Sequence, residues 1–191
     1  MQKVNKNMPK TLFINSCIRE ESRTLMLARE YLKTIDGEIT EVDLKKEELI
    51  PLDAELLSKR DASVKECKFD DPMFRYAKQF AEADNIVIAA PFWDLGFPSL
   101  LKIYIENIMV AGITFKYCDG RPMGICRAES LKYITTSGGP VKADFGYTYV
   151  KQVANDFFNI GNVSCRRAEN LDFYGITADE FFEKAEIIDI E

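Results

Sequence analysis

The sequence predicts a doubly wound α/β domain, a five-stranded parallel sheet with helices on both faces. Short apolar runs alternate with longer segments that repeat apolar residues at helical spacing. One run, residues 85–90, is apolar on both faces, as a central strand of a parallel sheet must be. The chain has 191 residues, enough for one domain with a sizeable core.

The first predicted elements are a strand, a helix and a second strand. Residues 11–15 form a short apolar run, and we expect a strand there. Residues 22–35 repeat apolar side chains near helical spacing, and Ser22 is a suitable N-cap for this helix. Residues 38–44 alternate between apolar and polar side chains, and we expect the second strand there.

A polar stretch follows, and its two ends, residues 51–60 and 70–84, are expected to be helical. In the second, Asp71 would cap the helix and Pro72 would occupy the first helical position, where its missing N–H costs nothing. Residues 85–90 then form the predicted central strand.

The second half of the chain repeats the alternation. Residues 99–109 form an amphipathic helix, 131–137 the fourth strand, and 147–160 a further helix. The fifth strand is expected within residues 162–171. Five strands fit the flavodoxin-like order 2-1-3-4-5 better than the six-stranded dinucleotide-binding fold.

We expect a last helix at residues 177–188, opened by a capping box between Thr177 and Glu180. Residues 1–10 contain no apolar signal-peptide core, and we expect them to form a loose N-terminal segment. Residues 11–191 would then form a single domain, because no linker, repeat or low-complexity tract divides them.

Composition excludes several classes of function. The formal net charge of −6 argues against nucleic acid or an anionic membrane as a partner, and no apolar run is long enough to span a membrane. Five cysteines without a C-x-x-C pair suggest reduced thiols in a cytoplasmic protein. The chain has no histidine, which excludes His-dependent triads and His-ligated metals; we expect no metal site.

Three unusual loops should meet at the carboxyl edge of the sheet, where ligands bind in doubly wound folds. The loop after the first strand, residues 15–24, is rich in hydroxyls and contains Arg19 and Arg23. It opens a helix, whose N-terminus can bind a phosphate. On this loop alone, an equally good interpretation is that Ser22 only caps the helix, and Glu20 and Glu21 weigh against a phosphate.

The loop after the third strand places Phe92 and Trp93 where small polar residues are usual. The loop after the fourth strand contains Gly138 and Gly139, which would let the backbone approach a flat ligand and adopt positive φ angles. Alternatively, the aromatic pair packs under the next helix and the glycines form an ordinary turn. Together, a phosphate site, an aromatic slot and a glycine backbone fit flavin mononucleotide (FMN).

Four segments resemble the FMN-dependent NAD(P)H:quinone oxidoreductase and azoreductase family, and the resemblance spans nearly the whole chain. The most specific is residues 89–117, AAPFWDLGFPSLLKIYIENIMVAGITFKY. The others are DLKKEELIPLDAELL (43–57), GRPMGI (120–125) and TTSGGP (135–140).

The resemblance implies a role for each matching position. The FMN phosphate would be held by Ser16, Ser22, Arg23 and Thr24. The flavin ring would be lined by Pro91, Phe92, Trp93, Asp94, Leu95 and Phe97, and its edge contacted by Ser137, Gly138 and Gly139. The resemblance also implies a homodimer, with the substrate pocket at the subunit interface.

The chain departs from the family at two points. Asp94 stands where the family commonly has Asn, and a carboxylate beside the ring would lower the flavin potential. Some members relay a proton through a Tyr–His pair, and this chain has no histidine. Tyr147 is the candidate catalytic side chain, with solvent as the alternative.

The expected activity is hydride transfer from NADH or NADPH through FMN to a quinone, azo or nitroaromatic acceptor, by a ping-pong mechanism in one cavity. The alternative is a flavodoxin-type electron carrier, which binds FMN but does not turn over NAD(P)H. A regulator without flavin on the same fold ranks last, because the strand ends lack an acidic cluster.

Overall fold

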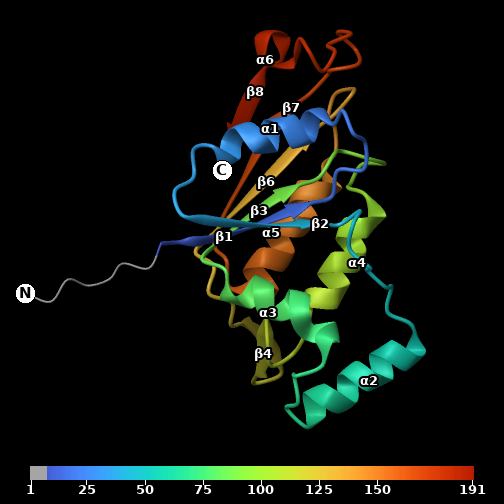
Figure 1. The fold of residues 1–191 in the computed structure, drawn as a ribbon, viewed down its shortest axis with the longest axis vertical. Coiled ribbons are helices and arrows are strands. Elements are labelled where there is room, and N and C mark those ends of the chain that lie inside the picture. The colour runs from blue at the N-terminus through green and yellow to red at the C-terminus, as the bar shows by residue number, and fades with distance from the viewer. Residues whose placement is uncertain (1–7) are drawn as a thin grey trace, which may run out of the picture.

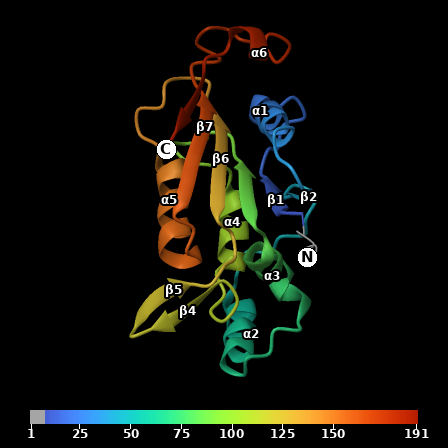
Figure 2. The ribbon, with the colours of Figure 1, turned by 90° about the vertical axis from the view of Figure 1, so that its left-hand side faces the viewer.

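A computed structural model describes residues 8–191 (Figures 1 and 2). Its main sheet has the strand order β2-β1-β3-β6-β7-β8, and only the β7–β8 pair is antiparallel. The strands are β1 (Lys10–Asn15), β2 (Glu38–Asp43), β3 (Asn85–Ala89), β6 (Ser130–Thr136), β7 (Asn162–Ala168) and β8 (Ile187–Ile190). The five predicted strands and their order are confirmed.

Helices cover both faces of this sheet (Figure 2). They are α1 (Arg23–Leu32), α2 (Ala54–Lys65), the short η1 (Pro72–Phe74), α3 (Arg75–Glu82), α4 (Ser99–Ile108), α5 (Phe145–Phe158) and α6 (Phe181–Lys184). Successive residues of a strand point into the two hydrophobic cores on opposite faces of the sheet. Ile14 packs with α3, α4 and α5 on one face, whereas Phe13 packs with α1 and Phe181 on the other.

The last helix is much shorter than predicted. Only Phe181–Lys184 is helical, and the isoleucines that follow form β8, with Ile188 opposite Arg167 of β7. The β-branched side chains suit a strand that extends the sheet. The predicted capping box is wrong: Thr177 contacts the Glu180 side chain at 3.3 Å, and no side chain caps α6.

Two further elements lie away from the main sheet. An antiparallel hairpin of β4 (Phe115–Cys118) and β5 (Arg121–Gly124) was not predicted. Its turn residues Asp119 and Gly120 both have positive φ angles, and this Asp-Gly pair is a sequence signal for such hairpins. Helix α2 is capped by Asp53, has no buried residue and stands away from the sheet (Figure 1).

Strand β1 begins at Lys10, one residue earlier than predicted. Of the expected loose N-terminal segment, residues 1–7 lie outside the described residues. Within residues 8–191, none of the helices has the length and apolar character needed to cross a membrane.

Candidate functional site

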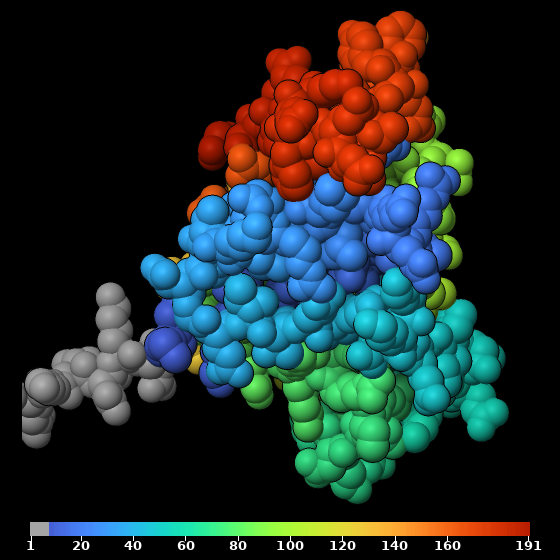
Figure 3. Space-filling model, turned by 45° about the horizontal axis from the view of Figure 1, so that its top comes forward, coloured from blue at the N-terminus to red at the C-terminus, as the bar shows by residue number. Residues whose placement is uncertain are grey.

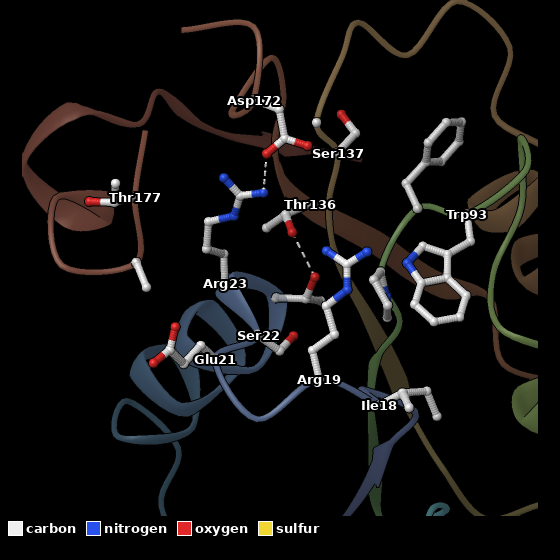
Figure 4. Close-up of a pocket in the computed structure, with 15 residues that line it drawn as sticks. Ile18, Arg19, Glu21, Ser22, Arg23, Trp93, Thr136, Ser137, Asp172 and Thr177 are labelled. Atoms are coloured by element: carbon white, nitrogen blue, oxygen red, sulfur yellow. Dashed lines mark hydrogen bonds and ion pairs between the residues drawn. The ribbon is translucent and has the colours of Figure 1, made fainter. Parts of the chain in front are cut away.

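A cavity of about 480 Å³ opens at the carboxyl edge of the sheet (Figure 4). The loops after β1, β3 and β6 all contribute, as the sequence predicts, and so does the segment after β7. Figure 3 shows this C-terminal segment, in orange and red, lying against the blue residues around α1. The lining residues are Ile18, Arg19, Glu21, Ser22, Arg23, Thr24, Pro91, Phe92, Trp93, Thr136, Ser137, Gly138, Asp172, Thr177 and Ala178.

The aromatic pair after β3 lines the cavity. Phe92 and Trp93 are half-buried and belong to neither hydrophobic core, so they do not pack as core residues under α4. The Phe92 amide donates to the Thr136 carbonyl at 3.0 Å, which fixes this loop to the end of β6. The cavity therefore has an aromatic wall formed by two adjacent side chains.

A tight turn follows the aromatic pair. The Trp93 and Gly96 backbones exchange hydrogen bonds of 3.2 and 2.7 Å, and Asp94 and Leu95 have φ angles of 51° and 65°. Positive φ at both central residues defines a type I′ turn, and a non-glycine residue there costs about 1–2 kcal/mol. The Leu95 carbonyl accepts from the Phe145 amide at 3.0 Å, which ties the turn to the start of α5.

Three predicted ring-lining residues support this loop and do not line the cavity. Asp94 and Leu95 are exposed at the turn. Phe97 packs against Tyr149 of α5, with ring centroids 5.7 Å apart. The structure thus places Asp94 outside the cavity wall, where its carboxylate is in solvent.

The N-terminus of α1 opens into the cavity. Ser22 caps it, because its hydroxyl accepts from the Leu25 amide at 3.2 Å. Among the described residues, the amides of Arg23 and Thr24 have no acceptor. These amides and the helix dipole favour an anion at this point, so Ser22 can cap the helix and also border an anion site.

Arg23 is already engaged by the C-terminal segment. Its guanidinium donates to the Ile176 carbonyl at 2.7 Å and to the Asp172 carboxylate at 2.5 Å. In contrast, the Arg19 guanidinium forms no ion pair or hydrogen bond within residues 8–191. Figure 4 shows both arginines pointing into the cavity, Arg23 toward Asp172.

The remaining hydroxyls of the first loop turn inward. Thr24 and Thr136 share a hydrogen bond of 2.6 Å, which joins α1 to the end of β6. Ser16 does not line the cavity, because it is fully buried and its hydroxyl donates to the Ala89 carbonyl at 2.9 Å. Cys17 is also buried, and desolvation raises its pKa to about 11. Burial and a raised pKa both favour a packing role for Cys17 over that of a reactive thiol.

The glycine loop differs from its prediction. Neither Gly138 nor Gly139 has a positive φ angle. Gly138 is needed for space, because an added Cβ would lie 2.1 Å from the Asp172 carboxylate, whereas Gly139 has open space around it. The buried Ser137 hydroxyl donates to the Gly139 carbonyl at 2.6 Å. Ser137 and Gly138 line the cavity, and Gly139 lies just beyond it.

Tyr147 does not reach the cavity. It is buried on the α5 side of the sheet, where its hydroxyl donates to the Val163 carbonyl at 3.0 Å. Burial raises the pKa of this phenol, although the neighbouring Lys151 opposes the shift. The structure gives Tyr147 a packing role, because it is remote from the cavity and its proton is bound to backbone.

An ionic network fixes the loop after β6 to β7. The Arg167 side chain lies 2.8 Å from Glu169 and 3.5 Å from Asp144. Glu169 accepts from the Val141 amide at 2.9 Å, and Asp144 caps α5 by accepting from the Tyr147 amide. Both ends of this loop are thereby tied to the sheet.

Sequence reasoning missed the contribution of the segment after β7. Asp172, Thr177 and Ala178 line the cavity, and the Asp172 amide donates to the Gly138 carbonyl at 2.9 Å. The sequence did indicate this contribution, because the segment follows a parallel strand and the carboxyl ends of parallel strands meet at one edge of the sheet. Ile18 and Thr136 also line the cavity and were not singled out.

The candidate site has mixed charge and lacks a metal cluster. Arg19, Arg23, Glu21 and Asp172 all contribute to the cavity lining, and of these charged groups Arg23 and Asp172 form an ion pair. Within residues 8–191, no group of three acidic or cysteine side chains is arranged to hold a metal ion. The site thus offers cations, helix amides and aromatic faces.

Comparison with known proteins gives consistent matches. Residues 9–188 match a protein family described as having a flavodoxin-like fold. An "FMN-dependent NADH:quinone oxidoreductase" of Clostridium perfringens is 35% identical over 187 residues, covering 93% of this chain and 94% of that protein. A protein of the same name from Coprothermobacter proteolyticus is 35% identical, covering 88% and 90%.

Solved structures agree. A crystal structure of an azoreductase from Bacillus anthracis superposes with a TM-score of 0.77 at 26% identity. The match covers 91% of this chain and 92% of that one. The family match, residues 9–188, includes every residue that lines the cavity.

Proposed function

Since this chain belongs to the family of FMN-dependent NADH:quinone oxidoreductases with a flavodoxin-like fold, we propose that it binds FMN in the cavity at the carboxyl edge of its sheet. It passes a hydride from NADH to a quinone or azo acceptor. The observation that carries the assignment is the pair Phe92 and Trp93, which line this cavity and belong to neither core.

The phosphate end of FMN would lie at the N-terminus of α1. The amides of Arg23 and Thr24 supply donors there, and Arg19 and Arg23 supply positive charge. Ser22 borders this end as the helix cap. Ser16, whose hydroxyl is bound to Ala89, would act by holding the loop in place.

The ring end would lie against the aromatic wall. Pro91, Phe92 and Trp93 form one side, and Ser137 and Gly138 border the other. Asp94, Leu95, Phe97 and Gly139 would contribute indirectly, by fixing the turn after Trp93 and the glycine loop.

Bound FMN supplies the hydride chemistry, and the protein supplies position and environment. One open cavity can receive NADH and then the acceptor, which favours a ping-pong mechanism with parallel steady-state lines. No histidine is present, and Tyr147 is buried away from the cavity. We therefore propose solvent at the cavity opening as the source of protons for the acceptor.

We extend the proposal to a homodimer in the cytoplasm. Leu95 and Phe145, joined by a backbone hydrogen bond beside the cavity, are 50% and 63% exposed. Apolar side chains of this size at the site edge fit contact with a second subunit. All five cysteines are free thiols, as in proteins of a reducing compartment.

The chain offers a direct test, because Trp93 is its one tryptophan. FMN added to flavin-free protein should quench most of the tryptophan emission. Trp93→Leu should weaken FMN binding by about threefold to tenfold, measured by equilibrium dialysis, because a stacked aromatic pair is lost. Phe182→Leu, an exposed aromatic change away from the cavity, is the matched control and should leave FMN binding unchanged.

Anaerobic NADH then distinguishes the enzyme from an electron carrier. Rapid bleaching of the bound flavin is expected of the oxidoreductase. Unchanged tryptophan emission with FMN would contradict the assigned cavity, whereas quenching without bleaching by NADH would favour the carrier.

A further inference from the structure

The charges that line the cavity cancel. Arg19 and Arg23 are balanced by Glu21 and Asp172. A phosphate monoester carries about −1.5 to −2 charges near neutral pH. Two arginines at a helix N-terminus would hold such a group strongly, and two carboxylates in the same cavity oppose it.

Asp172 is the carboxylate that forms an ion pair with Arg23. It accepts from the guanidinium at 2.5 Å, and the Ile176 carbonyl accepts from the other terminal nitrogen at 2.7 Å. A guanidinium has only five N–H donors in one compact plane. An anion that binds the remaining donors of Arg23 therefore lies within a few ångström of the Asp172 carboxylate.

Asp172 is held in this position from two sides. Its amide donates to the Gly138 carbonyl at 2.9 Å, and its carboxylate packs where a side chain on Gly138 would lie. Figure 4 shows Asp172 and Arg23 pointing toward one another. Because the Asp172 side chain is 69% exposed, solvent and salt screen its charge, so its effect on a ligand is moderate.

We propose that Asp172 limits the phosphate selectivity of the flavin site by competing with the flavin phosphate for Arg23. This inference rests on the proposed function and concerns how the same cavity distinguishes its ligands. The native site gains less from the phosphate than its two arginines would allow. FMN is therefore preferred over riboflavin, which has the same ring and no phosphate, by less than it would be without the Asp172 carboxylate.

Asp172→Asn tests this inference, because it keeps the shape of the side chain and removes its charge. Calorimetric titration of flavin-free protein should show FMN binding about fivefold tighter in the variant, since one anion near the phosphate is gone. Riboflavin binding should change by less than about twofold. The difference between the variant and the wild type should shrink at high salt.

Asp179→Asn is the matched control. Asp179 is exposed in the same segment and does not line the cavity, so its substitution changes the net charge equally and should alter neither affinity. Unchanged or weaker FMN binding in Asp172→Asn, or equal tightening of riboflavin, would overturn the inference and leave the FMN site standing. Wild-type protein that binds neither flavin would overturn the proposed function together with it.

Discussion

The backbone of Leu95 is in a strained conformation, with a positive φ angle, beside the candidate site. It occupies a left-handed turn position that suits Asn or Gly, and its carbonyl secures the turn to Phe145. The turn closes the loop that follows β3, and this loop places Trp93 beyond the end of that strand. Local strain at such positions is common where a backbone must hold a ligand-binding side chain.

Arg167 is the residue whose loss should most disturb the loop after β6. Its side chain and those of Asp144 and Glu169 are each less than 20% exposed. Arg167→Met would leave two carboxylates half-buried without their cation. The free energy of unfolding, measured by urea denaturation, should fall by about 1–3 kcal/mol.

The matched control for Arg167 is an exposed pair. Arg127 lies 2.7 Å from Asp84, but its side chain is 64% exposed. Arg127→Met should cost less than about 1 kcal/mol, because water screens the pair. Equal losses in the two variants would show that the network around Arg167 contributes no more than a surface ion pair.

At the scale of elements, β8 protects the edge of the sheet. It pairs antiparallel with β7 and places Ile187 against the core that contains α1. Removal of residues 187–191 would expose the unpaired backbone of β7, which is a template for aggregation. We expect a lower melting temperature and increased light scattering on heating.

Removal of Glu191 alone is the control for this truncation, because this residue lies beyond β8. It should leave both measurements unchanged. A truncated protein that melts like the wild type would mean that β8 adds nothing to the stability of the sheet.

At the scale of the whole molecule, the buried thiols are expected to make the free energy of unfolding depend on pH in the alkaline range. Burial raises the pKa of Cys17 to about 11 and those of Cys126 and Cys165 to about 12, from an ordinary value of 9.0. The folded protein keeps these protons at pH values where the unfolded chain releases them. The free energy of unfolding should therefore fall as pH rises above about 9, by up to about 1.4 kcal/mol per pH unit for each thiol.

Urea denaturation at a series of pH values measures this slope. Cys165→Ala should make it shallower, because one buried thiol no longer titrates on unfolding. Cys118→Ala, at an exposed cysteine, should leave the slope unchanged. A stability that stays constant from pH 8 to about pH 10 would contradict the prediction.

Much of the fold could be predicted because it depends on local patterns. The period of apolar residues gave the five parallel strands and most helices, and parallel strands bring their carboxyl ends to one edge. The location of the cavity therefore followed from the order of elements. The position of Phe92 and Trp93 in the cavity wall followed from aromatic residues standing where turn residues are usual.

The sequence by itself thus determined the architecture, the edge at which the cavity lies and the loops that form it. Only the tertiary structure decided which side chains face that cavity. Arg23 meets Asp172 across 149 residues of chain, Tyr147 turns to Val163, and residues 187–190 pair as a strand with β7. These outcomes depend on contacts between segments that are distant in the sequence. The spacing of apolar residues within one segment does not specify which side chain a residue contacts, or which edge of the sheet the last strand joins.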